Sequence, residues 1–77
     1  MATTEVTSEI IGSVWKIVKS QGDSVAEGEE IMILESMKME IPVEAPVDGT
    51  IAELSVAEGD QVSQDSPVAV IESTQGL

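Results

Sequence analysis

Several chemistries are excluded by residue types that this 77-residue sequence lacks. It has no cysteine and no histidine, which removes disulfides, thiolate and imidazole metal sites, Ser-His triads and cysteine nucleophiles. The absence of cysteine also fits a reducing compartment. Trp15 is the single aromatic residue. A lysine that forms a Schiff base needs a desolvated pocket, and so small a chain offers little room for one.

Long apolar runs are also missing. The longest, such as Ile31 to Leu34, have four residues, whereas a membrane span needs roughly 18. Residues 1–5 have no basic region followed by an apolar stretch, so no secretory signal is expected. Together with the absent cysteine, these features predict a cytoplasmic location and no contact with a membrane.

Positive charge is scarce. Fifteen Asp and Glu residues stand against three lysines, which gives a net charge of −12. Such a surface repels nucleic acid and anionic lipid. A partner should therefore present a basic surface, or the charge serves only to keep a small domain soluble and monomeric.

What the sequence does contain favours one small β domain. Apolar residues make up 42% of the chain, and most of them are Val and Ile, which suit a pleated sheet. A chain of this length forms a single domain. It buries only about 60% of the surface that its unfolded form exposes, so the core must be thin.

The strongest internal pattern is a repeat at an offset of 37 residues. Gly12 aligns with Gly49, and apolar residues mostly align with apolar residues. Each half has the pattern of strand, tight turn, short strand, turn and strand. Two copies are too few for a solenoid, so they predict a pseudo-symmetric unit in which both halves share one core. The strands are expected at 5–11, 14–19, 31–35, 39–44, 50–56 and 68–73, with prolines 42 and 67 at strand edges or starts.

The segment Glu35-Ser36-Met37-Lys38-Met39-Glu40 lies between the halves and breaks the usual rules for a turn. It has no Gly, Asn, Asp or Pro, yet the strands on either side must reverse near it. A two-residue hairpin turn needs positive φ at both central residues, which normally selects Asn-Gly or Asp-Gly. With Met37-Lys38 as the turn, Glu35 would face Glu40 in an unfavourable like-charge pair. A broken local rule without structural gain marks a candidate functional site.

Non-functional interpretations of the same residues exist. Lys38 is the only cation after Lys19, and it would also serve as a solvated loop lysine that offsets nearby carboxylates. Met37 and Met39 either stay exposed as soft contacts for a partner's groove or pack into the edge of the core. Composition and spacing leave both alternatives open.

The segment from Glu35 to Glu40 resembles the attachment motif of the biotinyl/lipoyl attachment domain family, whose biotinyl members centre on Met-Lys-Met. Residues 41–51 and 56–62 are similar to that family as well, and the likeness covers about residues 5–73, which leaves 74–77 as a short tail. The length resembles that of a small free-standing biotin carrier. The resemblance implies an all-β fold, a flattened barrel-sandwich hybrid of two four-stranded antiparallel sheets with pseudo-twofold symmetry. It also implies that Lys38 lies on an exposed hairpin turn, with both termini at the opposite end.

The resemblance implies a carrier that catalyses nothing itself. A biotin protein ligase would join biotin to Lys38 through an amide, and would read Met37 and Met39. Glu35 and Glu40 would help to present the turn. The attached biotin would then carry a carboxyl group from a biotin carboxylase to a carboxyltransferase.

Three departures from the family pattern and two alternative functions accompany this expectation. No extra protruding segment is visible between the first glycine turn and Ile31. Ser36 stands where many members have Ala, and residues 9–11 replace a Pro-Met-Pro-Gly-like stretch. A lipoyl carrier has the same fold, but its lysine typically lies in Asp-Lys-Ala. An unmodified interaction module of the same fold is the other alternative.

Overall fold

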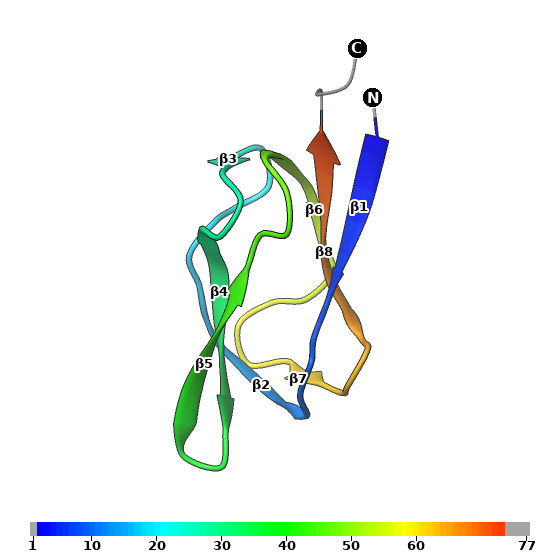
Figure 1. The fold of residues 1–77 in the computed structure, drawn as a ribbon. Coiled ribbons are helices and arrows are strands. Elements are labelled where there is room, and N and C mark those ends of the chain that lie inside the picture. Colours follow the sequence, from blue (N-terminus) through cyan, green and yellow to red (C-terminus); the bar gives the residue numbers. More distant parts are fainter. Residues whose placement is uncertain (1, 74–77) are drawn as a thin grey trace.

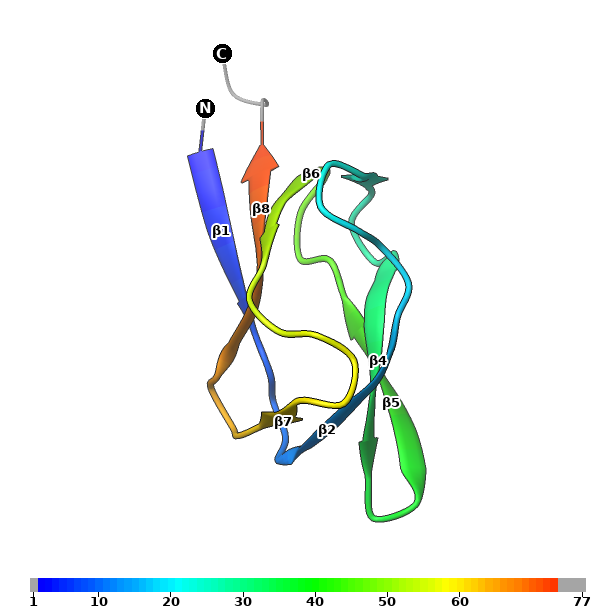
Figure 2. The same ribbon diagram turned by 180° about the vertical axis from the view of Figure 1, so that it is seen from behind.

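The computed structural model describes residues 2–73 as eight β-strands (Figures 1 and 2). Four strands form one antiparallel sheet in the order β1-β8-β6-β3, and four form a second in the order β5-β4-β2-β7. This arrangement confirms the expected all-β fold of two four-stranded sheets. Within residues 2–73, no helix is long and apolar enough to cross a membrane. The strands are β1 (Ala2–Thr7), β2 (Gly12–Ile17), β3 (Ser24–Val25), β4 (Glu30–Ser36), β5 (Met39–Glu44), β6 (Gly49–Leu54), β7 (Gln61–Val62) and β8 (Pro67–Ser73).

The repeat seen in the sequence is a repeat of structure. When the bounds of β1, β2, β3 and β4 are shifted by 37 residues, they fall on those of β5, β6, β7 and β8. The irregularities repeat too: the β2–β4 ladder has a bulge between Val14 and Lys16, and the β6–β8 ladder has one between Ile51 and Glu53. The predicted pseudo-symmetry is therefore confirmed down to single residues.

Each half completes the sheet of the other. β3 comes from the first half and pairs with β6, while β7 comes from the second half and pairs with β2. The backbone of Val14 accepts a hydrogen bond from the Gly59 N–H at 2.8 Å and donates one to the Asp60 carbonyl at 2.8 Å. The equivalent bonds in the other half join Ile51 to Gly22 and Asp23 at 2.7 and 2.8 Å. Neither half can satisfy its own backbone alone.

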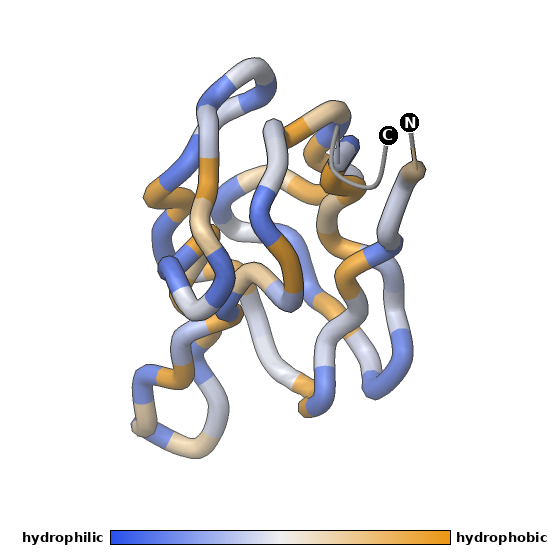
Figure 3. The backbone as a smooth tube through the Cα atoms, turned by 45° about the horizontal axis from the view of Figure 1, so that its top comes forward, coloured by the Kyte–Doolittle hydropathy of each residue, from blue (hydrophilic) through white to orange (hydrophobic). Residues whose placement is uncertain are grey.

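The core lies between the two sheets and draws on both halves. Apolar residues alternate with hydrophilic ones along the strands, as expected when one face of a sheet is buried (Figure 3). Ser8 is the buried polar exception, and its hydroxyl donates to the Ile10 carbonyl at 2.7 Å. The buried apolar side chains are Val6, Val14, Val25, Ile31, Met32, Leu34, Ala45, Ile51, Val62, Val68, Ala69 and Ile71.

The expected first strand was placed wrongly. The apolar pair Ile10-Ile11 suggested a strand over 5–11, but β1 ends at Thr7. The chain leaves the sheet at Ser8, whose backbone bonds to Ser66 and Asp65 and whose side chain bonds to Ile10. Local serine bonds of this kind compete with ladder pairing. The two prolines were placed correctly, since Pro67 opens β8 and Pro42 lies on the edge strand β5.

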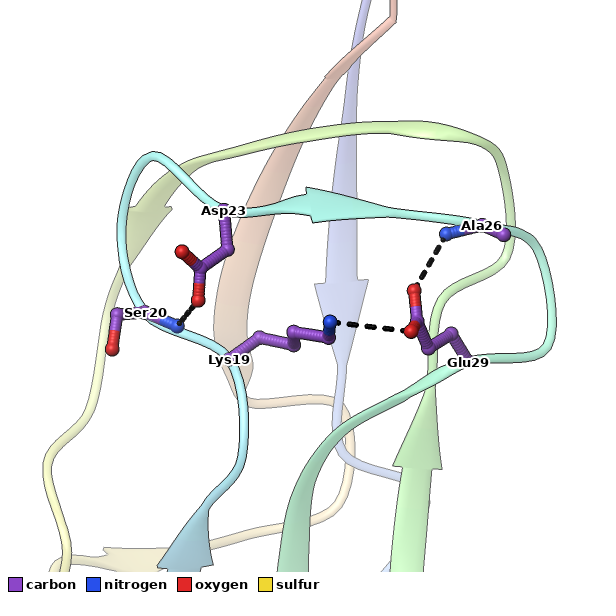
Figure 4. Close-up of polar contacts among 5 residues, drawn as sticks. All are labelled: Lys19, Ser20, Asp23, Ala26 and Glu29. Atoms are coloured by element: carbon purple, nitrogen blue, oxygen red, sulfur yellow. Dashed lines mark hydrogen bonds and ion pairs between the residues drawn. The ribbon is translucent and has the colours of Figure 1, made fainter.

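An ion pair closes the loops around β3, at the end of the molecule away from the β4–β5 turn (Figures 1 and 4). Lys19 Nζ lies 3.2 Å from Glu29 Oε2, and the Ala26 N–H donates to Glu29 Oε1 at 3.0 Å. The backbone hydrogen bond from Ala26, and then the contact with Lys19, hold the pKa of Glu29 below its ordinary value of 4.5. Nearby, the Ser20 N–H donates to Asp23 Oδ2 at 2.8 Å.

The lowered pKa of Glu29 predicts a pH-dependent contribution to stability. A carboxylate whose pKa is depressed by folding stabilises the fold above its ordinary pKa and loses that effect as the pH falls through its folded pKa. Wild type should therefore have a higher melting temperature than Glu29→Gln at pH 7, and the difference should shrink at pH 3. Lys19→Gln should also lower the melting temperature at pH 7. A difference between wild type and Glu29→Gln that stays the same at pH 3 would contradict this assignment.

Two equivalent glycines allow neighbouring strands of the same sheet to approach closely, Gly12 of β2 against β4 and Gly49 of β6 against β8. A Cβ on Gly12 would lie 2.5 Å from the Glu35 carbonyl oxygen, and a Cβ on Gly49 would meet the Glu72 carbonyl oxygen at least as closely. The obstacle in both cases is backbone within a strand, which cannot move without disturbing its ladder. Glycine is required at both positions for this reason.

Gly12→Ala and Gly49→Ala should each lower the free energy of unfolding by about 1–3 kcal/mol, the usual cost of inserting a methyl group into closely packed structure. Ser13→Ala, at the position beside Gly12, adds no atoms and serves as the matched control. Urea unfolding followed by circular dichroism measures the difference. Glycine variants as stable as the control would show that the neighbouring strands accommodate the methyl group without cost.

Candidate functional site: the Met37-Lys38 turn

The hairpin of β4 and β5 ends in a two-residue turn formed by Met37 and Lys38. Their φ angles are 52° and 66°, both in the left-handed region. Ser36 pairs with Met39 directly behind the turn, and Glu35 pairs with Glu40. These features confirm the predicted turn, including positive φ at two residues that have side chains.

The surrounding ladder holds this unfavourable turn in place. Left-handed backbone costs roughly 1–2 kcal/mol for a residue with a Cβ, and it persists only where the rest of the structure dictates it. β4 and β5 are paired along their whole length, from Glu30 opposite Glu44 to Ser36 opposite Met39. In addition, the Ser36 Oγ–H donates to the Ile11 carbonyl at 2.8 Å and ties the hairpin to the segment before β2. Ser36, where many family members have Ala, therefore makes a structural bond.

The turn projects all three of its expected contact residues into solvent. The Met37 side chain is 92% exposed, that of Met39 is 61% exposed, and Lys38 is exposed as well. The methionines do not pack into the core edge, which resolves the alternative that the sequence left open. The turn lies at one end of the molecule, and β1 begins and β8 ends at the other (Figures 1 and 2).

Charge around the turn is mostly negative. Glu35 and Glu40 are exposed and occupy opposite positions on β4 and β5. Among residues 2–73, the only ion pair joins Lys19 to Glu29, so the Lys38 ammonium is not held by a carboxylate there. The result is an accessible primary amine on a fixed turn. Such a group is suited to acylation by another protein.

Among residues 2–73, the lysine turn has no metal site beside it. In the part of the chain that the structure describes, no three acidic residues gather in a way that could hold a metal ion. A hollow of about 360 Å³ lies beside the turn, and its lining includes Ile11, Ser13, Glu35 and Met37.

Ile11, which lines this hollow, was not among the residues that the sequence pointed to as functional. The signal that would have found it is the repeat, because the equivalent position in the second half holds Asp48.

Comparison with known proteins agrees with this geometry. The model of the Biotin_lipoyl family, described as "Biotin-requiring enzyme", matches residues 1–71. The chain belongs to the biotin/lipoyl family.

Two relatives of similar length share most of this biotin/lipoyl domain. It is 45% identical over 67 residues to "Biotinylated protein TB7.3 homolog" of Mycobacterium leprae, covering 87% of this chain and 94% of that one. It is 41% identical over 71 residues to "Biotin/lipoyl attachment protein" of Bacillus subtilis, covering 91% and 97%. These matches show a small attachment domain of a non-catalytic carrier type.

The same domain occurs inside large enzymes. The chain is 39% identical over 66 residues to the "Biotin-dependent acyl-coenzyme A carboxylase alpha3 subunit" of Mycobacterium leprae, where it spans 11% of the protein. The crystal structure of the Kluyveromyces lactis urea carboxylase matches with a TM-score of 0.88 and 35% identity, covering 94% of this chain but only 6% of that one. Homologous domains therefore lie within biotin-dependent carboxylases.

The strain in the turn predicts that the lysine site lowers stability. Replacing Met37-Lys38 with Asn-Gly supplies the residues that prefer this turn and should raise the free energy of unfolding by about 1–2 kcal/mol. For a domain of this size, each kcal/mol corresponds to roughly 4–8 °C in melting temperature. Lys38→Ala keeps a Cβ at positive φ and should bring no such gain. A melting temperature of the Asn-Gly variant at or below that of wild type would contradict the prediction.

Proposed function

We propose that this domain is a biotin carboxyl carrier and that Lys38 is its attachment site. The observation that carries the proposal is a lysine amine on a fixed, exposed turn between two exposed methionines. The name of the Mycobacterium leprae relative, a biotinylated protein, supports biotin as the cofactor. The Met-Lys-Met sequence favours biotin over lipoate, whose target lysine typically lies in Asp-Lys-Ala.

Attachment would be an acyl transfer performed by a biotin protein ligase. The neutral Lys38 Nζ attacks the carbonyl carbon of biotinyl-adenylate, an amide C–N bond forms, and the C–O bond to AMP breaks. No carboxylate of residues 2–73 is paired with Lys38, so the ligase supplies the base that takes the amine proton. Met37 and Met39 would be contacts that the ligase reads, and Glu35 and Glu40 would orient the acidic turn toward a basic surface.

The role of the protein is then presentation rather than catalysis. Once attached, biotin would supply the chemistry of accepting and releasing a carboxyl group, and Lys38 would hold it on the exposed turn within reach of a biotin carboxylase and a carboxyltransferase. Tethering raises the effective concentration of biotin at both active sites, and the cofactor supplies the chemistry. Enzymes of the kind that contain the homologous domains are the partners that this proposal requires.

The intact mass of the protein from its native host tests the proposal. Wild type should show one biotin-sized increment and bind streptavidin, and Lys38→Ala should show neither. Lys38→Arg keeps the charge and should also lack the increment, because a guanidinium is not acylated in this way. Lys16→Ala and Lys19→Ala are the matched controls and should keep it.

Three results would count against this function. If wild type shows a lipoyl-sized increment that Lys38→Ala lacks, Lys38 is still the attachment site but the cofactor is lipoate. If Lys38→Ala keeps the increment, the cofactor is attached at a residue other than Lys38. If no increment appears in cells whose other biotin proteins are modified, the remaining alternative is an unmodified interaction module.

A further inference from the structure

Large apolar side chains are exposed unequally in the two halves. Ile11 is 72% exposed and Trp15, the single aromatic residue, is 49% exposed. Their equivalents in the second half are Asp48 and Ala52. The other exposed large apolar residues within 2–73 are Val18, Met37 and Met39, and they also lie in the first half or at the turn.

The second half serves as an internal control for folding. Trp15 is the extra residue of the bulge between Val14 and Lys16, and Ala52 is the extra residue of the equivalent bulge. The same backbone therefore forms with an alanine at this position. Ile11 and Trp15 are not needed to fill the core, and exposed apolar residues that gather on one surface are typical of an interaction site.

The exposed apolar residues lie on one face of the sheet that carries Lys38. On β4, Met32 and Leu34 are buried, so Ile33 between them faces outward. Ile33 pairs with Pro42 on one side and Lys16 on the other, next to Trp15. We name this surface the apolar face and define it by Ile11, Trp15, Ile33 and Pro42.

The corresponding surface of the other sheet is acidic. Val70 takes the place of Ile33 there, and its neighbours across the sheet are Glu5 and Glu53. On the other sheet, the outward valine is therefore flanked by two glutamates. On the sheet that carries Lys38, the equivalents of these glutamates are Pro42 and Lys16.

The apolar face and the lysine turn lie on the same sheet, and the exposed pair Glu35 and Glu40 lies between them. Ile33 lies four residues before Met37 on the same hairpin, which is about 13 Å at roughly 3.3 Å per residue. Within the apolar face, Ile11 lies next to the turn, because Ile11 and Met37 both line the hollow together with Glu35. A protein that fills this hollow while bound at the turn would contact Ile11, and an interface that extends about 13 Å along the hairpin would also include Ile33.

We propose that the apolar face is the docking surface of the enzyme that acylates Lys38, an inference that rests on the proposed function. An enzyme that acts on the amine itself must bring its surface up to the turn, whereas one that acts on the far end of an attached arm can stay further away. The complementary surface has an apolar socket for the Trp15 indole. It also has lysine or arginine side chains that meet Glu35 and Glu40, neither of which has a side-chain partner among residues 2–73.

Exchanging the two distinctive residues for those of the second half tests the proposal. Ile11→Asp combined with Trp15→Ala introduces side chains that this backbone already accommodates at the equivalent positions. Steady-state biotinylation by the purified ligase of the host should show a KM raised by about 10- to 100-fold, the effect of losing an aromatic anchor from an interface. The kcat should change little, since Lys38 and its turn are intact. Val70→Ala, on the outer face of the other sheet, is the matched control and should leave KM unchanged.

Each of the following outcomes would contradict the proposal that the ligase docks on the apolar face. An unchanged KM in a double variant that circular dichroism shows to be folded removes the proposal directly. A KM that is unchanged while later carboxylation of the biotin slows would assign the face to a biotin carboxylase. Sedimentation that shows a wild-type dimer and a monomeric double variant would assign it to a second copy of this chain. If wild type itself is not modified at Lys38, the proposed function fails, and the docking surface fails with it.

Discussion

The reciprocal exchange of short strands between the halves is the constraint on which the whole structure depends. β3 and β7 have two residues each and no core of their own, yet each closes the sheet of the opposite half. Backbone hydrogen bonds of Val14 with Gly59 and Asp60 hold the two halves together, and so do the equivalent bonds of Ile51. With a thin core and no disulfide, the chain relies on this interlock to make two incomplete halves into one domain. Gly12 and Gly49, which pair with β7 and β3 and approach β4 and β8 closely, are part of the same requirement.

The interlock explains why the lysine turn can be both strained and well placed. The pair behind the turn, Ser36 and Met39, is equivalent to the pair formed by Ser73 and Ala2. The symmetry thus places the turn at one end of the molecule and the pairing of β1 with β8 at the other (Figure 1). The turn itself contributes little to the core, so its residues are available for recognition. Left-handed backbone at Met37 and Lys38 is maintained by the ladder and by the bond from Ser36 to Ile11. A fixed turn with exposed side chains presents the amine in a constant geometry to any enzyme that approaches.

The sequence predicted the symmetry of the two halves from a periodic pattern, and the lysine turn from residues that are unusual in a turn. The 37-residue repeat predicted the equivalence of the halves, and poor turn chemistry at Met37-Lys38 predicted the left-handed turn and its register. The sheet count came from the family resemblance rather than from periodicity. The end of β1 was missed because a single buried serine, Ser8, outweighs the strand preference of two isoleucines. The bond from Ser36 to Ile11 could not be foreseen, since it depends on how two segments meet in space.

Native-state hydrogen exchange tests the interlock most directly, because it reports which amides open together. The amides of Val14 and Gly59, which join the halves on one side, and those of Ile51 and Gly22 on the other, should be among the most protected. In rising urea concentrations, both pairs should merge with the central amides of β4 and β8 into a single unfolding reaction. Exchange of Gly22 and Ile51 through an opening that leaves Val14 and Gly59 protected would contradict the account. The halves would then be separable units, and the lysine turn would not depend on their union.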